Sequence, residues 1–400
     1  MPVETTRPEF CPNSSCRCHD RTIAARYQWF VHFGSFQTRA RGTIRRFRCR
    51  ECGKTCSTQT FSVHYWTHYT NDLGWLLGEI YTCTGLRQIG RLAGVTHRVI
   101  QNRCRRLARN ALAVMDQALR SLDLNENLTM DGFESFTRSH YHPNNITHVC
   151  GCDSQFIYAA VHTLFRRKGA MTAAQRRRRA RIDAVWRPST TLREQCAYML
   201  SDLAPTIDDA CRKRSAPVEF HTDEHNAYPP AIAAVPSLSQ RIADGTLRHC
   251  RTNSRVARTT KNPLFAVNYV DRQLRKNLAE FVRKTVRQGR EVNSQMERFA
   301  IFMVMHNFLT PHRISGRAHV SDEETHADMA GVRDRKVTDL LARMITHRHV
   351  RTHLSRQLWW IRRIWLRLHE NPLAVRRTKG RIEDRPVCLG QAAVPKYLLA

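Results

Sequence analysis

The pattern of apolar and polar positions divides the chain into a helical part and a part that begins with strands. Between Asn71 and Leu122, apolar residues recur every three or four positions, which is typical of the buried face of a helix. Beyond Leu122 they gather in short runs bounded by polar residues. The segments 128–134, 148–153 and 156–166 are therefore predicted to be strands.

A helix, a strand and a second helix are predicted after these three strands. The helix covers 192–212, the strand covers 217–223, and the second helix begins within 228–235. A three-stranded meander followed by helix, strand and helix is the order of the RNase H-like fold. We therefore expect an α/β domain with a mixed five-stranded sheet, in which the first and fourth strands are neighbours and carry acidic residues.

Two aspartates occupy those positions. Asp131 lies in the middle of the first predicted strand, and Asp223 ends the fourth. Glu134 is a weaker competitor for the role of Asp131. An acid at a turn or in a surface ion pair is a simpler interpretation of each residue, but their places on the two strands favour a shared catalytic site.

A third acid is expected from the long helix predicted after Asn262. Its apolar stripe consists of Val270, Leu274, Leu278 and Val282. Asp271 follows the first of these residues, about 100° round the helix, at the edge of the packed face. The competing candidates for this third position are Glu280, Glu291 and Glu297.

Three carboxylates suit a two-metal phosphoryl-transfer site. Hard carboxylate oxygens bind Mg²⁺ or Mn²⁺ and leave open positions for the substrate phosphate. Two such ions activate the nucleophile and stabilise the leaving oxygen. Asp131, Asp223 and Asp271 are therefore the predicted catalytic and metal-binding residues, and Arg275 and Lys276 on the third-acid helix are predicted to contact DNA phosphates.

The N-terminal cysteines predict a structural zinc site. The chain contains 14 Cys, and pairs of them near the N-terminus have the spacing of zinc knuckles. The expected ligands are Cys11, Cys16, Cys49 and Cys52, although Cys18 or His19 could replace Cys16. Predicted strands at 27–33 and 43–48 lie between the pairs, as in a zinc ribbon. Buried free cysteines are the alternative interpretation.

A helix-turn-helix is predicted over 85–109. Helix 71–82 precedes it, Gly94–Val95 forms its tight turn, and Thr96 caps its second helix. The polar face of that second helix suits base edges and phosphates in a major groove. Its predicted DNA-binding residues are His97, Arg98, Gln101, Asn102, Arg105 and Arg106. The alternative is a helical hairpin with a solvated basic face.

The charge of the chain points to a polyanionic partner. It carries 65 Lys and Arg against 34 Asp and Glu, a formal net charge of +31. Such an excess favours binding to nucleic acid by counterion release. No apolar run is long enough to span a membrane, and no signal peptide is evident, so a cytoplasmic, nucleoid-associated protein is expected.

Two further segments are informative. The arginine-rich segment 175–181 is expected in a loop, either solvated or in contact with phosphate. An amphipathic C-terminal helix is expected to pack on the core or on a second subunit, and contact with DNA through its arginine face is the alternative. Its stripe consists of Leu354, Leu358, Ile361, Trp365 and Leu368.

Together these motifs resemble prokaryotic insertion-sequence transposases with an RNase H-like DDE/DDD core, most similar to the insertion-sequence-one type. RFRCRECGKTCS looks like their zinc knuckle, GLRQIGRLAGVTHRVIQNRCRRL like their helix-turn-helix, and HTDEHNAY like their second-aspartate motif. NYVDRQLRKNLAEFVRKT and ERFAIFMVMHNF resemble their third-acid region, although this chain has Asp271 where those enzymes usually carry Glu. The resemblance covers roughly residues 10–312.

The resemblance implies a transposase that binds the ends of its element and cleaves and joins DNA with Mg²⁺ or Mn²⁺. It also implies a role for Asp223, and for Tyr228 in holding the fold or DNA. A homo-oligomer is expected, because two DNA ends must be processed together. The alternative function is a zinc/helix-turn-helix regulator with an inactive nuclease-like domain, and a junction resolvase is a third candidate.

The expected organisation has four parts. They are a zinc ribbon over 1–65, a helix-turn-helix over 66–122, an RNase H-like domain over 123–314 and a basic helical region over 315–400.

Overall fold

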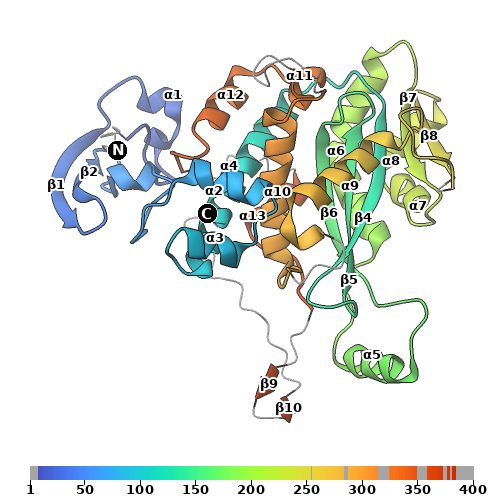
Figure 1. The fold of residues 1–400 in the computed structure, drawn as a ribbon. Coiled ribbons are helices and arrows are strands. Elements are labelled where there is room, and N and C mark those ends of the chain that lie inside the picture. The colour runs from blue at the N-terminus through green and yellow to red at the C-terminus, as the bar shows by residue number, and fades with distance from the viewer. Residues whose placement is uncertain are drawn as a thin grey trace.

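A computed structural model describes residues 8–253, 255–282, 287–313, 324–348, 358–372, 376–378 and 381–383. Its N-terminal part lies at one side of the molecule and a mixed sheet at the other, with a layer of helices between them (Figure 1). Among the described residues, no helix combines the length and apolar character needed to cross a membrane.

The N-terminal part is a small antiparallel sheet with its own core. Its strands run in the order β1-β2-β3, and its core is formed mainly by aromatic residues and cysteines, including Phe10, Trp29 and Phe61. Its elements are η1 (Arg17–His19), α1 (Arg21–Ala24), β1 (Phe30–Thr38), β2 (Gly42–Cys49), β3 (Thr55–Ser57) and η2 (Thr58–Phe61).

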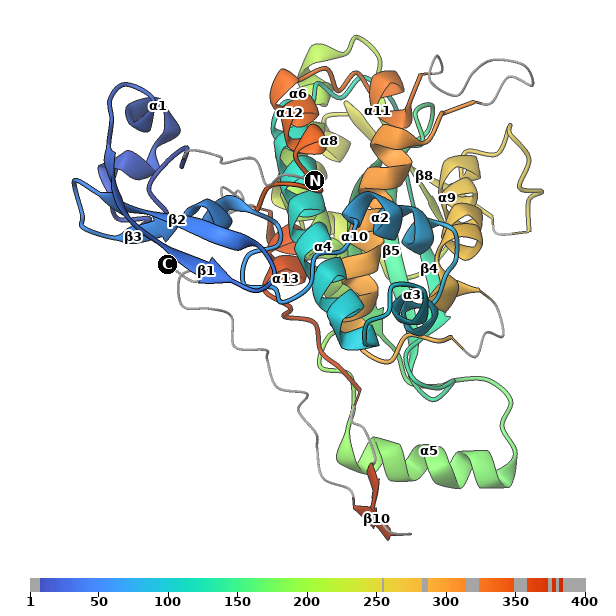
Figure 2. The same ribbon diagram turned by 60° about the vertical axis from the view of Figure 1, so that its left-hand side comes forward.

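The helical layer is centred on a long helix, α4, which begins directly after its N-cap Thr96. It packs against α10, α12 and α13 (Figure 2). One continuous hydrophobic core of described residues runs from Val63 to Trp365, so the predicted helix-turn-helix and the sheet share a core. The helices of the layer are α2 (Leu73–Tyr81), α3 (Leu86–Leu92), α4 (His97–Arg120), α10 (Val292–Leu309), α11 (His326–Met329), α12 (Arg335–Ala342) and α13 (Trp359–Trp365).

The predicted mixed five-stranded sheet is present, and its order is β6-β5-β4-β7-β8. β4, β5 and β6 are joined antiparallel, whereas β4–β7 and β7–β8 are parallel. The strands are β4 (Leu128–Phe136), β5 (Pro143–Gly151), β6 (Ile157–Leu164), β7 (Val218–Asp223) and β8 (Leu247–Thr252). This order places β4 and β7 side by side in the middle of the sheet.

Helices cover the sheet on both faces. α6 (Leu192–Lys213), α7 (Tyr228–Ala233) and α8 (Pro236–Ala243) pack together, and α6 contacts β6 and β7. α9 (Phe265–Asn277) packs on β4 and β5. Successive strand residues point to opposite faces, and the adjacent residues Thr147 and His148 face α6 and α9 respectively. The two helices therefore lie on opposite faces.

The arginine-rich segment forms a helix, so the predicted loop at 175–181 is wrong. α5 (Ala173–Val185) has no buried residue and extends away from the body of the molecule (Figure 1). Its N-terminus is closed by a capping box between Thr172 and Gln175. Alanine and arginine favour helix without any apolar period, which explains why periodicity did not predict it.

The third-acid helix is shorter than the predicted one. α9 ends at Asn277, and Leu278 has an extended backbone with φ −114° and ψ 117°. A short 3-10 turn, η3 (Ala279–Phe281), follows and places Phe281 against Phe133 at 5.2 Å between ring centroids. Val282 is therefore not part of a buried stripe, and its side chain is 37% exposed. Arg283 and Lys284 lie outside the described residues.

The C-terminal region returns to the core. α13 packs against α4, α6 and α10, as the core-packing interpretation expected, with Leu358, Ile361 and Trp365 buried. Leu368 is 44% exposed and so does not continue the buried stripe, while Leu354 lies outside the described residues. Two short strands, β9 (Arg376–Thr378) and β10 (Arg381–Glu383), pair antiparallel beyond this helix.

Candidate active site and zinc centre

The four predicted zinc ligands form a compact cluster. The sulfur atoms of Cys11, Cys16, Cys49 and Cys52 all lie within 4.8 Å of one another. Cys11 Sγ is 3.6 Å from Cys52 Sγ, and Cys16 Sγ is 3.7 Å from Cys49 Sγ. Tetrahedral zinc with Zn–S bonds of about 2.3 Å separates its sulfurs by roughly 3.8 Å. The cluster therefore fits a structural zinc ion.

Cys16 completes this cluster, and the two alternative ligands have other partners. Cys18 Sγ lies 2.8 Å from the Tyr27 hydroxyl, and His19 Nδ1 lies 2.7 Å from the Cys11 carbonyl oxygen. After Cys52 the chain turns at Gly53, whose φ of +70° favours glycine. Gly53 N–H donates to the Cys49 carbonyl oxygen at 3.1 Å, so this turn closes the segment that holds the second pair of cysteines.

Asp131 and Asp223 are brought together by the sheet. Thr129 aligns with His221 and Met130 with Thr222 in the parallel β4–β7 pair, so the two aspartates follow at the next aligned position. Burial, with a further contribution from the Asp223 carboxylate, raises the pKa of Asp131 to about 6. Asp223 Oδ1 accepts a hydrogen bond of 2.8 Å from the His225 backbone N–H.

Asp271 reaches the same face from α9. Burial and the Asp131 carboxylate raise the pKa of Asp271 to about 8, although Arg275 and Arg258 oppose the shift. The raised pKa values of Asp131 and Asp271 indicate that negative charge on these two carboxylates is unfavourable without a nearby cation. A divalent metal ion bound between the carboxylates would offset this unfavourable negative charge.

Tyr228 lies beside this group. Burial raises the pKa of the Tyr228 phenol well above its usual value, and Asp131, Asp223 and Asp271 all contribute to the rise. The three carboxylates are less compact than the cysteine cluster, because their oxygen atoms do not all lie within 4.8 Å of one another. That spacing is compatible with a pair of ions, because no single ion has to bind all three acids.

Three further side chains lie near the three aspartates. The sequence analysis did not name two of them, and it did not predict the contact that the third makes. His148 stands opposite Asp131 in the β4–β5 register, and its Nε2 lies 3.7 Å from Asp271 Oδ1. Burial lowers the pKa of His148 to about 4, so its ring is neutral near pH 7. The Arg258 guanidinium is 3.6 Å from Asp131 Oδ2, and the predicted DNA-binding residue Arg275 lies 4.7 Å above the Phe133 ring.

The competing acids have structural partners. Glu280 forms a buried ion pair with Arg298. Glu291 and Glu297 both pair with Arg367, and Glu297 also lies 3.6 Å from Arg105. These pairs connect α10 with its neighbours and favour Asp271 as the third acid of the group.

The predicted DNA-binding face of α4 is divided between solvent and the protein. His97, Arg98 and Asn102 are exposed. Gln101 donates to Ser294 Oγ at 2.6 Å, and Arg106 donates to the Val63 carbonyl oxygen at 2.7 Å. The exposed residues therefore cluster at the N-terminal turns of α4, while Gln101, Arg105 and Arg106 also make contacts within the protein. Lys276, at the end of α9, is exposed as well.

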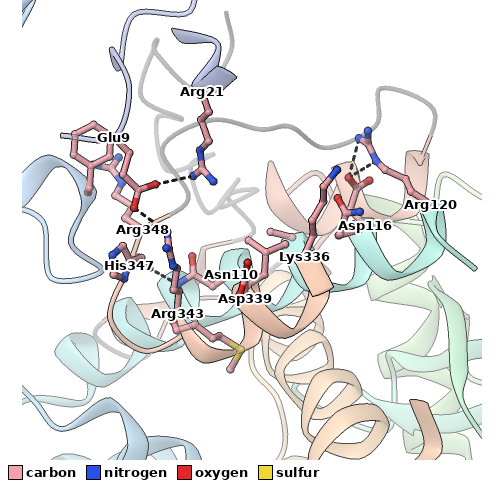
Figure 3. A pocket seen from close by; sticks show the side chains of 15 residues that line it. Glu9, Arg21, Asn110, Asp116, Arg120, Lys336, Asp339, Arg343, His347 and Arg348 are labelled. Atoms are coloured by element: carbon pink, nitrogen blue, oxygen red, sulfur yellow. Dashed lines mark hydrogen bonds and ion pairs between the residues drawn. The ribbon is translucent and has the colours of Figure 1, made fainter. Parts of the chain in front are cut away.

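A separate cavity of about 500 Å³ lies between the N-terminal part, α4 and α12 (Figure 3). Arg343 donates to Glu9 Oε1 at 2.8 Å at its border, and Glu9 also lies 3.6 Å from Arg21. None of the three aspartates lines it. The cavity belongs to the junction between the N-terminal part and the helical layer.

Comparison with known protein families finds no match to this chain, and comparison with curated proteins finds none either. Arguments about function therefore rest on the residues and their geometry.

Proposed function

We propose that the chain is a DNA transposase with an RNase H-like DDE/DDD catalytic domain, similar to the insertion-sequence-one type. The observation that carries the proposal is the convergence of Asp131, Asp223 and Asp271 on one face of the sheet. Strand order supports it too, because the first strand lies between the second and the fourth, as that fold requires. The cysteine cluster and the exposed start of α4 supply the DNA-binding modules that a transposase needs.

The residues present fit a divalent cation. Asp131, Asp223 and Asp271 would hold Mg²⁺ or Mn²⁺ through carboxylate oxygens, and Asp271 Oδ1 is buried with no hydrogen-bond partner among the described residues. When bound, such ions activate water or a 3′-hydroxyl as nucleophile and stabilise the leaving oxygen.

The remaining side chains position the acids and the DNA. His148, neutral and fully buried, stands beside Asp271 and limits the positions open to its carboxylate. Arg258 and Arg275 place positive charge next to the acids, where a DNA phosphate would lie. Gly132 lies directly after Asp131, and an added Cβ there would approach Asn145 Nδ2 to 2.0 Å, so glycine leaves room for the Asn145 side chain.

DNA binding is assigned to three surfaces. His97, Arg98 and Asn102 begin α4 and can reach base edges, and the zinc-binding sheet precedes them in the chain. Arg275 and Lys276 follow Asp271 and would contact phosphates close to the cleaved bond. The third surface is α5, whose exposed arginines include Arg177 and Arg181. The net charge of +31 supports the binding of a polyanion to all three surfaces.

The proposal is tested by Asp131→Asn, Asp223→Asn and Asp271→Asn in cleavage of DNA that carries the ends of the element. Each variant should lose donor cleavage and strand transfer while it still binds the ends, because a metal ligand is lost and the recognition surfaces remain. Asp153→Asn is the matched control, since this aspartate follows β5 outside the group, and it should cleave normally.

Two outcomes would contradict the proposal in different ways. Normal cleavage by Asp271→Asn together with loss in Glu280→Gln, Glu291→Gln or Glu297→Gln would assign the third ligand elsewhere. A parent protein that binds element ends but cleaves none with Mg²⁺ or Mn²⁺ would favour a regulator with an inactive nuclease-like domain.

A further inference from the structure

A second set of metal-binding side chains lies on β7 and β8. Glu219, His221 and Cys250 each offer one ligand atom, and these atoms lie within 4.8 Å of one another. His221 aligns with Cys250 in the parallel β7–β8 pair, and Glu219 precedes His221 by two residues. All three side chains therefore project from one face of the sheet.

His221 is the most buried member of this cluster, with 8% of its surface exposed. Its Nε2 lies 3.2 Å from Glu219 Oε2, while its Nδ1 is buried without a hydrogen-bond partner among the described residues. Thr129 aligns with His221 across the β4–β7 pair, and its hydroxyl is also buried without a partner. The His221 ring nitrogen therefore has no protein partner among the described residues and is available to an additional ligand.

The charges around the cluster leave its carboxylate available. Arg248 stands opposite Glu219 on β8, yet within the described part of the chain Glu219 forms its ion pair with His221. Cys250 Sγ makes only a long contact of 3.9 Å to the Arg248 carbonyl oxygen. Glu219 and Cys250 are both partly exposed, which gives an ion a route from solvent.

We propose that Glu219, His221 and Cys250 bind a transition-metal ion of the Zn²⁺ class. A thiolate, an imidazole and a carboxylate are ligands of zinc and cobalt, whereas Mg²⁺ prefers oxygen ligands alone. Three protein ligands leave a fourth position for water or another small ligand. The site is distinct from the four-cysteine cluster and does not depend on transposase activity.

The ion would join the edge strand of the sheet to its neighbour. β8 pairs only with β7 among the described strands, and β7 carries Asp223 two residues beyond His221. A bound ion would cross-link the two strands and restrain the end of β7.

The proposal is tested with Co²⁺ added to the purified full-length protein, whose four-cysteine site is first filled with zinc. Tetrahedral Co²⁺ bound through a thiolate gives visible absorption bands that free Co²⁺ lacks. The parent should show these bands with about one equivalent of Co²⁺ beyond the zinc already present. Cys250→Ser should remove the thiolate band, and Glu219→Gln should weaken binding at least about tenfold, because even outer-shell changes cost 10–100-fold.

Two controls separate a metal site from a structural cluster. Cys83→Ser removes a half-buried thiol elsewhere and should leave the Co²⁺ spectrum unchanged. Arg248→Gln removes a cation beside the site and should strengthen Co²⁺ binding. Absence of thiolate bands in the parent, or identical spectra in the parent and Cys250→Ser, would show that the cluster is only a hydrogen-bonded His–Glu pair next to a thiol.

Discussion

At the scale of single residues, buried carboxyl groups make the stability of the fold depend on pH, because their ionised form is unfavourable in the folded state. Asp202 on α6 is one of them: its Oδ2 accepts a 2.9 Å hydrogen bond from the Trp360 backbone N–H of α13. Burial raises the pKa of Asp202 from 3.8 to about 6. Because the folded-state pKa is raised, the stability linked to this group is present at low pH and lost as pH rises through about 6.

Asp202→Asn should therefore stabilise the protein near pH 7 and have little effect near pH 4. The amide oxygen can still accept the Trp360 N–H but carries no charge. A shift of about two pKa units corresponds to at most ~3 kcal/mol, and partial exposure reduces it to about 1–2 kcal/mol. Thermal unfolding of both proteins at several pH values measures the difference; a gap that stays constant from pH 4 to pH 7 would contradict the assignment.

The same scale explains which site residues the sequence could predict. Asp131 and Asp223 lie in apolar runs that read clearly as strands, so their alignment followed from the fold. His148 and Arg258 could not be predicted. His148 comes close to the acids through the pairing of β4 with β5, and Arg258 does so through the loop between β8 and α9. His148 is one of several polar residues in β5, and nothing in the sequence distinguishes it from Asn144, Asn145 or Thr147.

At the scale of elements, prediction succeeded where apolar runs were continuous and failed where polar residues are buried. β4, β6, β7 and α6 lie within two residues of their predicted bounds at every end. β5 begins five residues earlier than predicted, because its first part contains the polar residues Asn144 and Asn145. These two residues are buried, and their side chains form hydrogen bonds with Thr137 and Thr147. The fifth strand, β8, is an edge strand of mostly polar residues and had no apolar signal at all.

Helix α5 presents a different physical problem, because it lacks a packed face. An isolated helix of this length is marginal in water. It is attached near its C-terminus by a 2.5 Å ion pair between Arg166 and Asp183, and near its middle by Arg178 above the Tyr141 ring. Its apolar residues are too few for insertion into a lipid surface, and its exposed arginines suit phosphates instead.

Replacing Arg177 and Arg181 together with Gln should reduce the salt dependence of DNA binding. These residues are four positions apart on one helix face, and Gln preserves helix propensity. Loss of two phosphate contacts should lower the slope of log K against log salt by about 1.8. Arg193→Gln with Arg212→Gln, on α6 at the opposite face of the sheet from the acids, is the matched control. Equal slopes for both double variants would show that α5 does not contact DNA.

At the scale of the whole molecule, the N-terminal part has a core of its own but is attached to the helical layer. Val63 N–H donates to the Thr346 carbonyl oxygen at 3.0 Å, and Arg348 N–H donates to the Phe61 carbonyl oxygen at 2.7 Å. The separate aromatic core is small, so we expect its stability to depend on a metal ion in the four-cysteine cluster.

Zinc removal should therefore unfold the N-terminal part and leave the five-stranded sheet folded. With a strong chelator, hydrogen exchange should accelerate over Phe30–Thr38 and Gly42–Cys49 and remain slow over Leu128–Phe136. Specific DNA binding should fall in parallel. Cys49→Ser with Cys52→Ser should show the fast exchange before any chelator is added, and unchanged protection of the parent after zinc loss would refute a folding role for the metal.

Assembly is the final consequence at this scale. Under the proposed function, one group of Asp131, Asp223 and Asp271 acts on one DNA end, whereas transposition joins two ends to one target. The active complex should therefore contain at least two copies of the chain. Mass measurement of the protein bound to paired element ends tests this directly. When Asp223→Asn protein is mixed with parent, the joining of paired ends should fall more steeply than the fraction of parent protein in the mixture. The reason is that every complex with one inactive subunit fails to process one of its two ends. A proportional decrease, with a complex that contains a single copy, would contradict shared action by two subunits.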